Sequence, residues 1–434
     1  MKTIIGILLF IHLMSFYVLN FFPNLYPTLL ASLTISTFFV CLQIIKEIMI
    51  NKDRKQFFVF AGLLGSVFLI ISYIAEIRWS INPFGMIDAY AMWVGKGRVL
   101  AISILEGDPL PLWNTYWRMP NYPLGIPLLH ANFSLAFPTL ENFLTTIRIP
   151  NYIYLALLYS FILGRIQELK SIRFKILFII TTGAFLFQPN YLLVTSDLCA
   201  DFPVSVVLAI VTFFLLNSER KYDFYWMISC LALLINLKSE ALLIAMLASI
   251  FFLYLYLSKK QKLIRPFLIL FLLLIFLGSP TWYLFGKGSF LSSDFKDVNN
   301  SSSQLQFLIG RLFDKQIWLL IIKYFSNFYF TLTKGLTLSL ILIVLIWGNR
   351  KLRIGGLFYL VCISTYTGIF LLTSLDPEIH LDQAYDRIHL QLFLIPLVIF
   401  WEFIKQNEIL MTKLIRELGN LGLNYFKILK KKFI

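Results

Sequence analysis

The chain has 434 residues, of which 59% are hydrophobic and only 14% are charged, and its mean hydropathy is +0.77. This composition excludes an ordinary water-soluble globular protein, because such chains carry more charge and fewer apolar residues. The formal net charge of +15 would suit nucleic acid, but the basic residues form short clusters between apolar runs, as they do in membrane proteins with positive-inside topology. Nucleic acid is therefore not an expected partner.

The apolar runs predict a polytopic all-α membrane protein. Uninterrupted stretches of roughly 20 apolar residues indicate membrane-spanning helices, since the strands of a barrel would alternate apolar and polar residues. Placing the basic clusters in the cytoplasm fixes the direction of each crossing and puts both termini there. About twelve spans follow: 4–20, 27–45, 57–75, 148–164, 176–194, 200–217, 223–237, 240–257, 266–285, 335–348, 354–372 and 388–404.

The same assignment leaves three longer segments on the outer side: 76–147, 286–334 and 373–387. Within the first two, 124–138 and 318–332 are predicted to lie along the membrane surface, because a crossing there would reverse the side of later basic clusters. Residues 238–240 become the turn of a short helical hairpin at the outer face. The chain divides into an N-terminal transmembrane hairpin (1–56), a main transmembrane domain (57–404) and a basic cytoplasmic tail (405–434).

Ionisable residues beside apolar sequence are candidates for function, because their burial is costly. In chain order, Asp88 follows the third span and would open an amphipathic helix, where it is either a catalytic carboxylate or the helix N-cap. The four-residue spacing of Asp197 and Asp201 would place both carboxylates on one helical face, and capping would explain only one of them. Lys238 and Glu240 are either functional or a surface pair with a snorkelling lysine.

The last candidates, Arg387 and His389, stand at the outer mouth of the final predicted span. Arg387 could instead anchor that span at the interface. The predicted topology puts the whole set on the outer side: Asp88, Asp197, Asp201, Lys238, Glu240, Arg387 and His389. One physical interpretation is a cavity at the outer leaflet, in which lysine and arginine hold a phosphate while a carboxylate acts on an acceptor hydroxyl.

Several short motifs occur in a recognisable order. They are the run from Asp88 to Trp93, the turn Asn121-Tyr122-Pro123, Arg148-Ile149-Pro150, Ala200-Asp201-Phe202-Pro203 and Lys238-Ser239-Glu240-Ala241. Together they resemble the integral membrane GT-C glycosyltransferases, particularly the bacterial mannosyltransferases and aminoarabinose transferases that use polyprenyl-phosphate sugars. The chain departs from that branch at Asn121, where the branch has aspartate, and at Ala241, where it has glycine. The spans before residue 57 are additional.

The resemblance implies transfer of a sugar from a polyprenyl-phosphate donor to an extracytoplasmic glycan, lipid or protein at the inner membrane. It implies Asp88 as the general base, with Lys238, Arg387 and His389 on the donor phosphate. The other expected substrate contacts are Asp197, Asp201, Glu240 and Tyr122. A divalent cation and no cofactor at all both remain open.

Two other functions remain as alternatives. A transporter or flippase for a lipid-linked or small anionic solute would also place charges in the membrane, although it would favour the midplane and internal repeats. A polysaccharide polymerase or ligase would be expected to have its main outer loop late in the chain, whereas here the largest loop is early.

Overall fold

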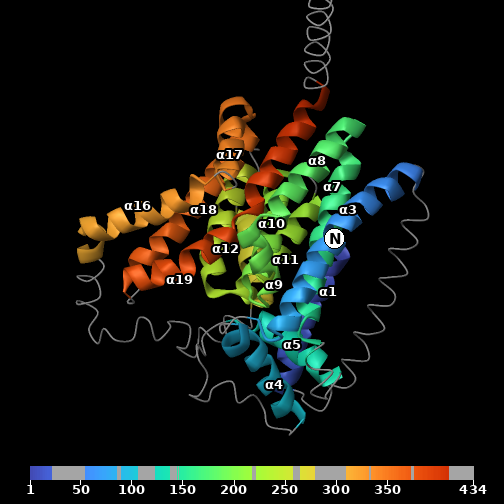
Figure 1. Ribbon diagram of the computed structural model, residues 1–434, viewed down its shortest axis with the longest axis vertical. Helices are drawn as coiled ribbons and strands as arrows, with labels where there is room; N and C mark the ends of the chain where they lie inside the picture. Colours follow the sequence, from blue (N-terminus) through green and yellow to red (C-terminus); the bar gives the residue numbers. More distant parts are fainter. Residues whose placement is uncertain are drawn as a thin grey trace, which may run out of the picture.

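The computed structural model describes residues 1–21, 54–85, 89–105, 123–136, 144, 146–217, 221–257, 264–278, 309–331, 334–372 and 376–409 (Figure 1). All regular elements within these residues are helices, so the predicted all-α class is confirmed for this part of the chain. They are α1 (Lys2–Phe21), α3 (Arg54–Ile81), the π-helix η2 (Ala89–Val94), α4 (Gly95–Leu105), α5 (Gly125–Ala136), α7 (Ile149–Glu168), α8 (Ile172–Leu186), α9 (Pro189–Ser196), α10 (Asp201–Asn217), α11 (Lys221–Leu237), α12 (Ser239–Leu257), α13 (Ile264–Leu277), α16 (Lys315–Tyr329), α17 (Gly335–Trp347), α18 (Arg350–Leu372), α19 (Pro377–Leu390) and a last helix over 394–409.

Within the described residues, four helices are long and apolar enough to cross a membrane: Gln56–Ile81, Ile149–Glu168, Arg350–Leu371 and Pro377–Ile409. A fifth candidate is the bent pair formed by α8 and α9. Shorter apolar helices, among them α10, α11, α12 and α17, complete the bundle. These are membrane-type helices. The number of crossings stays a prediction, and the predicted span 27–45 lies outside the described residues.

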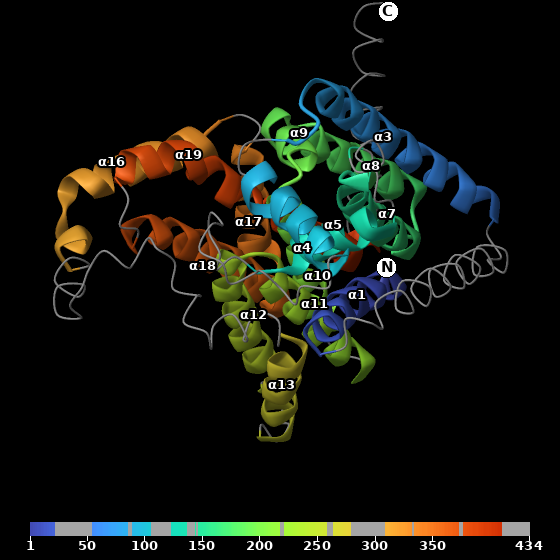
Figure 2. The same ribbon diagram turned by 90° about the horizontal axis from the view of Figure 1, so that it is seen from below.

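Helix α10 forms the centre of the bundle (Figures 1 and 2). Its side chains are buried from Asp201 to Leu216, and it contacts α7, α9, α11, α12, α18 and α19. A helix that is apolar on every side is surrounded either by lipid or by other helices, and the burial of α10 shows that other helices surround it. Because Asp201 is the first residue of α10, the central helix carries a carboxylate at its buried N-terminal end.

The predicted continuous span 176–194 is wrong in one respect. The chain bends by 73° between α8 and α9. Pro189 begins α9, and because proline has no N–H and its ring clashes with the preceding turn, α8 cannot continue through it. The Gln188 side chain caps the new helix by accepting a hydrogen bond from the Tyr191 backbone N–H at 2.8 Å. Helix α9 therefore runs across the bundle and leads into α10.

The two predicted surface segments are both helical, as α5 and α16. Figures 1 and 2 show α4 and α5 beneath one end of the bundle, and α16 running beside α19. Helix α5 is buried along most of its length and contacts α1, α4, α7 and α11. Its apolar composition therefore reflects contact with other helices. Helix α1 joins the main bundle through α5 and α11, and Asn132 donates to Ser15 Oγ at 2.7 Å.

Candidate functional site

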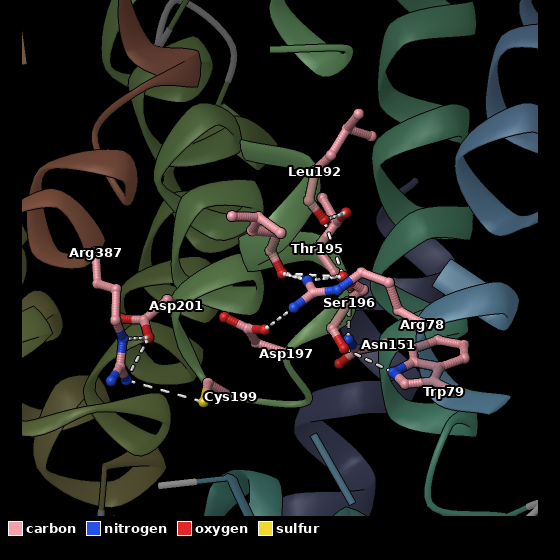
Figure 3. Close-up of polar contacts among 11 residues, drawn as sticks. Arg78, Trp79, Asn151, Leu192, Thr195, Ser196, Asp197, Cys199, Asp201 and Arg387 are labelled. Atoms are coloured by element: carbon pink, nitrogen blue, oxygen red, sulfur yellow. Dashed lines mark hydrogen bonds and ion pairs between the residues drawn. The ribbon is translucent and has the colours of Figure 1, made fainter. Parts of the chain in front are cut away.

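Asp201 is the centre of a buried polar cluster. Its carboxylate is 1% exposed and accepts from the Lys238 ammonium at 2.7 Å on Oδ1. Arg387 donates to Oδ2 from Nη2 at 3.0 Å and from Nε at 3.3 Å (Figure 3). Gln391 Nε2 donates to Oδ1 at 2.6 Å. We call Asp201, Lys238, Arg387 and Gln391 the Asp201 cluster, and within it one acidic group organises two cations.

Two separate parts of the chain supply the cations and the amide. Lys238 is the single non-helical residue between α11 and α12, which confirms the predicted hairpin turn. Arg387 lies in the last turn of α19, and Gln391 follows that helix. Tyr366 of α18 donates to Gln391 Oε1 at 2.8 Å, which directs the amide nitrogen of Gln391 toward Asp201. The cluster therefore joins five helices at one end of the bundle.

The Lys238 side chain is only 6% exposed, so its interpretation as a snorkelling surface residue is wrong. Burial alone would lower its pKa, but the carboxylates of Asp201 and Glu240 more than compensate, and the pKa of Lys238 is raised. Glu240 Oε1 lies 3.7 Å from the Lys238 nitrogen. Lys238 is therefore a cation at neutral pH, as a phosphate ligand would have to be.

A second set of contacts fixes the loop that precedes α10 (Figure 3). Arg78, near the end of α3, donates to the Leu193 carbonyl at 2.9 Å and lies 3.3 Å from Asp197 Oδ1. The neighbouring Trp79 donates from its indole to the Ser196 carbonyl at 2.6 Å. Helices α3 and α9 are thus joined directly beside the Asp201 cluster.

The loop itself has an unusual backbone. Leu198 adopts a φ of 56°, the left-handed region that a branched side chain rarely occupies. Gly85, with a φ of +71°, approaches the Asp197 carbonyl so closely that a Cβ atom there would collide with it. Asn151 of α7 donates to the Thr195 carbonyl at 2.8 Å. The loop therefore keeps a strained shape because α3, α7 and Gly85 hold it.

Asp197 and Asp201 do not share a helical face, contrary to the sequence expectation. Helix α9 ends at Ser196 and α10 begins at Asp201, so the two carboxylates flank a loop and point to different cations. Burial raises the pKa of Asp197 to about 6, although Arg78 and Arg387 oppose the shift. Asp197 therefore changes its charge close to neutral pH.

Arg148, from the Arg-Ile-Pro motif, lies in a separate ion pair. Its Nη1 is 2.5 Å from Glu76 Oε2, and the Tyr152 hydroxyl donates to Glu76 Oε1 at 2.5 Å. These contacts join the start of α7 to α3, the helix that also carries Arg78. In this structure Arg148 stabilises the packing of helices around the loop.

His389 lies apart from the Asp201 cluster although it is two residues from Arg387. Its Nδ1 is hydrogen-bonded to the Tyr329 hydroxyl at 2.8 Å, and its ring stacks on Tyr385 with a centroid distance of 4.2 Å. Phe328 and Tyr366 complete an aromatic surrounding. The side chain is 1% exposed. The structure thus brings together Asp201, Lys238 and Arg387, with Glu240 beside Lys238, but not His389.

Two predicted site residues, Asp88 and Tyr122, lie outside the described residues. In the described part of the chain, no group of three or more His, Cys, Asp or Glu side chains could hold a metal ion. Sequence reasoning missed Arg78, Gln391 and Tyr366. Arg78 could have been found as a lone basic residue just after an apolar run, whereas an amide and a phenol in apolar sequence give no comparable signal.

No protein-family model, no curated protein and no solved structure matches the chain. The resemblance to GT-C glycosyltransferases thus stays a prediction that rests on the short motifs.

Proposed function

We propose that this protein is a membrane glycosyltransferase that moves a sugar from a polyprenyl-phosphate donor to an extracytoplasmic acceptor. The main support is the convergence of Lys238 and Arg387 on one buried carboxylate at the end of the central helix. Two cations fixed side by side with low exposure are suited to a phosphate that gains charge as it leaves a sugar.

In this proposal Asp201 is a positioning residue. Its Oδ2 accepts hydrogen bonds from Nε and Nη2 of Arg387, and its Oδ1 accepts one from the Lys238 ammonium. Guanidinium and ammonium groups donate hydrogen bonds and accept none, so both cations suit the oxygens of a phosphodiester. Asp201 thereby offsets the repulsion between the two cations and orients them toward the same ligand.

Asp88 is the proposed general base. It would take the proton of the acceptor hydroxyl while that oxygen forms a bond to the anomeric carbon. The bond between the anomeric carbon and the phosphate oxygen breaks, and its electron pair leaves with the lipid phosphate, which Lys238 and Arg387 stabilise. Asp197, Glu240 and Tyr122 are proposed to contact the sugar. We leave His389 out of the phosphate site because Tyr329 and Tyr385 already hold its ring.

The proposed orientation places the Asp201 cluster at the outer face of the inner membrane. Arg78 lies near the cluster, whereas Gln56 marks the other end of α3. Their separation along the helix corresponds to roughly 33 Å, about the thickness of the hydrocarbon core. The basic residues from Arg165 to Lys175, at the adjoining ends of α7 and α8, lie at the Gln56 end and in this proposal face the cytoplasm, in keeping with the positive-inside rule.

A transporter of lipid-linked or anionic solutes is the second candidate. The bend of 73° between α8 and α9 favours it, since broken helices are common in transporters. The charged residues lie at helix ends, however, which favours an enzyme that meets its acceptor at the membrane surface.

The two functions separate in proteoliposomes that contain radiolabelled polyprenyl-phosphate sugars and an acceptor extract. We expect the wild type to transfer the labelled sugar to the acceptor. The transfer rate should fall at least about a hundredfold in Asp88→Asn and by a comparable factor in Arg387→Gln. Asp382→Asn, an exposed change on α19, is the control at equal amounts of folded protein. If labelled lipid moves across the bilayer and no label reaches any acceptor, the protein is a transporter and the proposed enzyme function is wrong.

A further inference from the structure

A cavity of about 240 Å³ lies between α3, α7 and α8, at the end of α3 remote from the Asp201 cluster. Its floor is apolar and includes Phe60 of α3 with Leu163 and Ile166 of α7. Its polar lining comes from Gln56, Gln167 and Lys175, one residue from each helix. The cavity is thus amphipathic, with an apolar side and a hydrogen-bonding side.

Among the described residues that line the cavity, Lys175 alone carries a formal charge. Its ammonium lies 5.3 Å from the centroid of the Phe60 ring, and none of the described carboxylates forms an ion pair with it. The cavity therefore presents a positive charge that no described carboxylate pairs with.

We propose that this cavity binds an anionic phospholipid. Lys175 would pair with the phosphodiester, the two glutamine amides would donate to phosphate and ester oxygens, and the first part of an acyl chain would lie on Phe60, Leu163 and Ile166. A soluble anion would gain nothing from that apolar floor, and the choline ammonium of a zwitterionic lipid would be repelled by Lys175. In the proposed orientation the cavity opens at the cytoplasmic leaflet, where basic pockets between helices bind acidic headgroups.

The experiment is a lipid titration of the purified full-length protein in detergent, with the bound lipid counted by native mass spectrometry. Phosphatidylglycerol is compared with phosphatidylcholine of the same acyl chains. Lys175→Gln should weaken phosphatidylglycerol binding about fivefold, the loss expected for one basic residue at a lipid headgroup. Arg173→Gln, an exposed change two residues away on α8, is the matched control. Gln167→Glu, which adds a carboxylate to the lining, should weaken binding at least as much.

The site is supported if the wild type prefers phosphatidylglycerol, if Lys175→Gln and Gln167→Glu abolish this preference, and if Arg173→Gln leaves it intact. If Lys175→Gln and Arg173→Gln lose phosphatidylglycerol binding equally, the attraction is a general property of the basic surface, and the proposed site is wrong. Equal binding of both lipids by the wild type also overturns it, as does an unchanged preference in Lys175→Gln. The titration requires no sugar donor, so its result is independent of the glycosyltransferase assay.

Discussion

The Arg387 guanidinium forms two hydrogen bonds to one oxygen of Asp201, at 3.0 and 3.3 Å, although the residues come from opposite halves of the chain. Asp201 is 1% exposed and Lys238 occupies its other oxygen. Breaking a buried ion pair by removing one partner leaves an uncompensated charge. The stability of this end of the bundle therefore depends on the carboxylate more than on either cation.

Asp201→Ala should lower the free energy of unfolding by about 3–5 kcal/mol, because it leaves both cations without their acceptor. Arg387→Gln should cost less, since Lys238 still neutralises Asp201 and Arg387 is 22% exposed. Thermal unfolding in detergent, followed by intrinsic fluorescence, measures both. Asp382→Asn, also on α19, should stay within about 0.5 kcal/mol of the wild type. A smaller effect for Asp201→Ala than for Arg387→Gln would contradict the central role of Asp201.

Gly85→Ala should lower stability by about 1–2 kcal/mol or more, since the left-handed backbone disfavours any side chain and the new methyl group meets the Asp197 carbonyl. Gly164→Ala is the matched control: its methyl group would meet no atom within 4 Å inside α7. It should be neutral or stabilising by up to about 1 kcal/mol. Melting temperatures of the two variants, measured side by side, decide the point, and equal values would show that the contact with Asp197 is unimportant.

Asp197 should make stability depend on pH. Its pKa is raised by burial to about 6, above the value of 3.8 for a free carboxyl, so the folded state holds the proton more tightly than the unfolded state. The stability gained from this tighter proton binding is fully present below about pH 4 and is lost as the pH rises through about 6. Asp197→Asn, which keeps a neutral group there, should flatten the melting temperature across that range. A steeper fall in the variant would mean that attraction to Arg78 exceeds the cost of burial.

Glu408 should order the first turn of α8. Its Oε1 accepts from the Ser171 N–H at 2.5 Å and its Oε2 from the Lys170 N–H at 3.1 Å, next to the helix N-terminus. Glu408→Gln keeps one acceptor and loses the negative charge, at a cost of about 1–2 kcal/mol. Hydrogen exchange of the 170–175 amides should accelerate in this variant. Glu378→Gln, an exposed change on α19, should leave those amides as protected as in the wild type.

Much of the helix pattern was predictable from the sequence. Long apolar runs and the basic clusters between them identified α7, α8, α10, α11 and α12 and the turn at Lys238, because hydropathy reports burial in lipid or protein alike. The bend at Pro189 was missed, since the segment 176–194 stays apolar through it. The burial of α5 was also missed, because apolar composition does not distinguish contact with lipid from contact with other helices.

The sequence was enough to assign the site residues to one end of the bundle, but it did not show which side chains form ion pairs with one another. The order of charges along the chain grouped Asp201, Lys238 and Arg387 at one end, and the structure does bring them together. Nothing in the spacing showed that Asp201 joins the two cations or that Asp197 turns toward Arg78. Those pairings depend on the bend between α8 and α9 and on the loop that follows, which are tertiary features.

The short central helices also affect how a substrate reaches the cluster. Helices α10 and α11 have 17 residues each, and a helix of that length spans roughly 26 Å, less than the approximately 30 Å of a typical hydrocarbon core. If their other ends meet the opposite interface, Asp201 and Lys238 lie recessed below the nearer headgroups. A molecule with a long hydrocarbon tail could then approach sideways from within the bilayer, without exposing that tail to water.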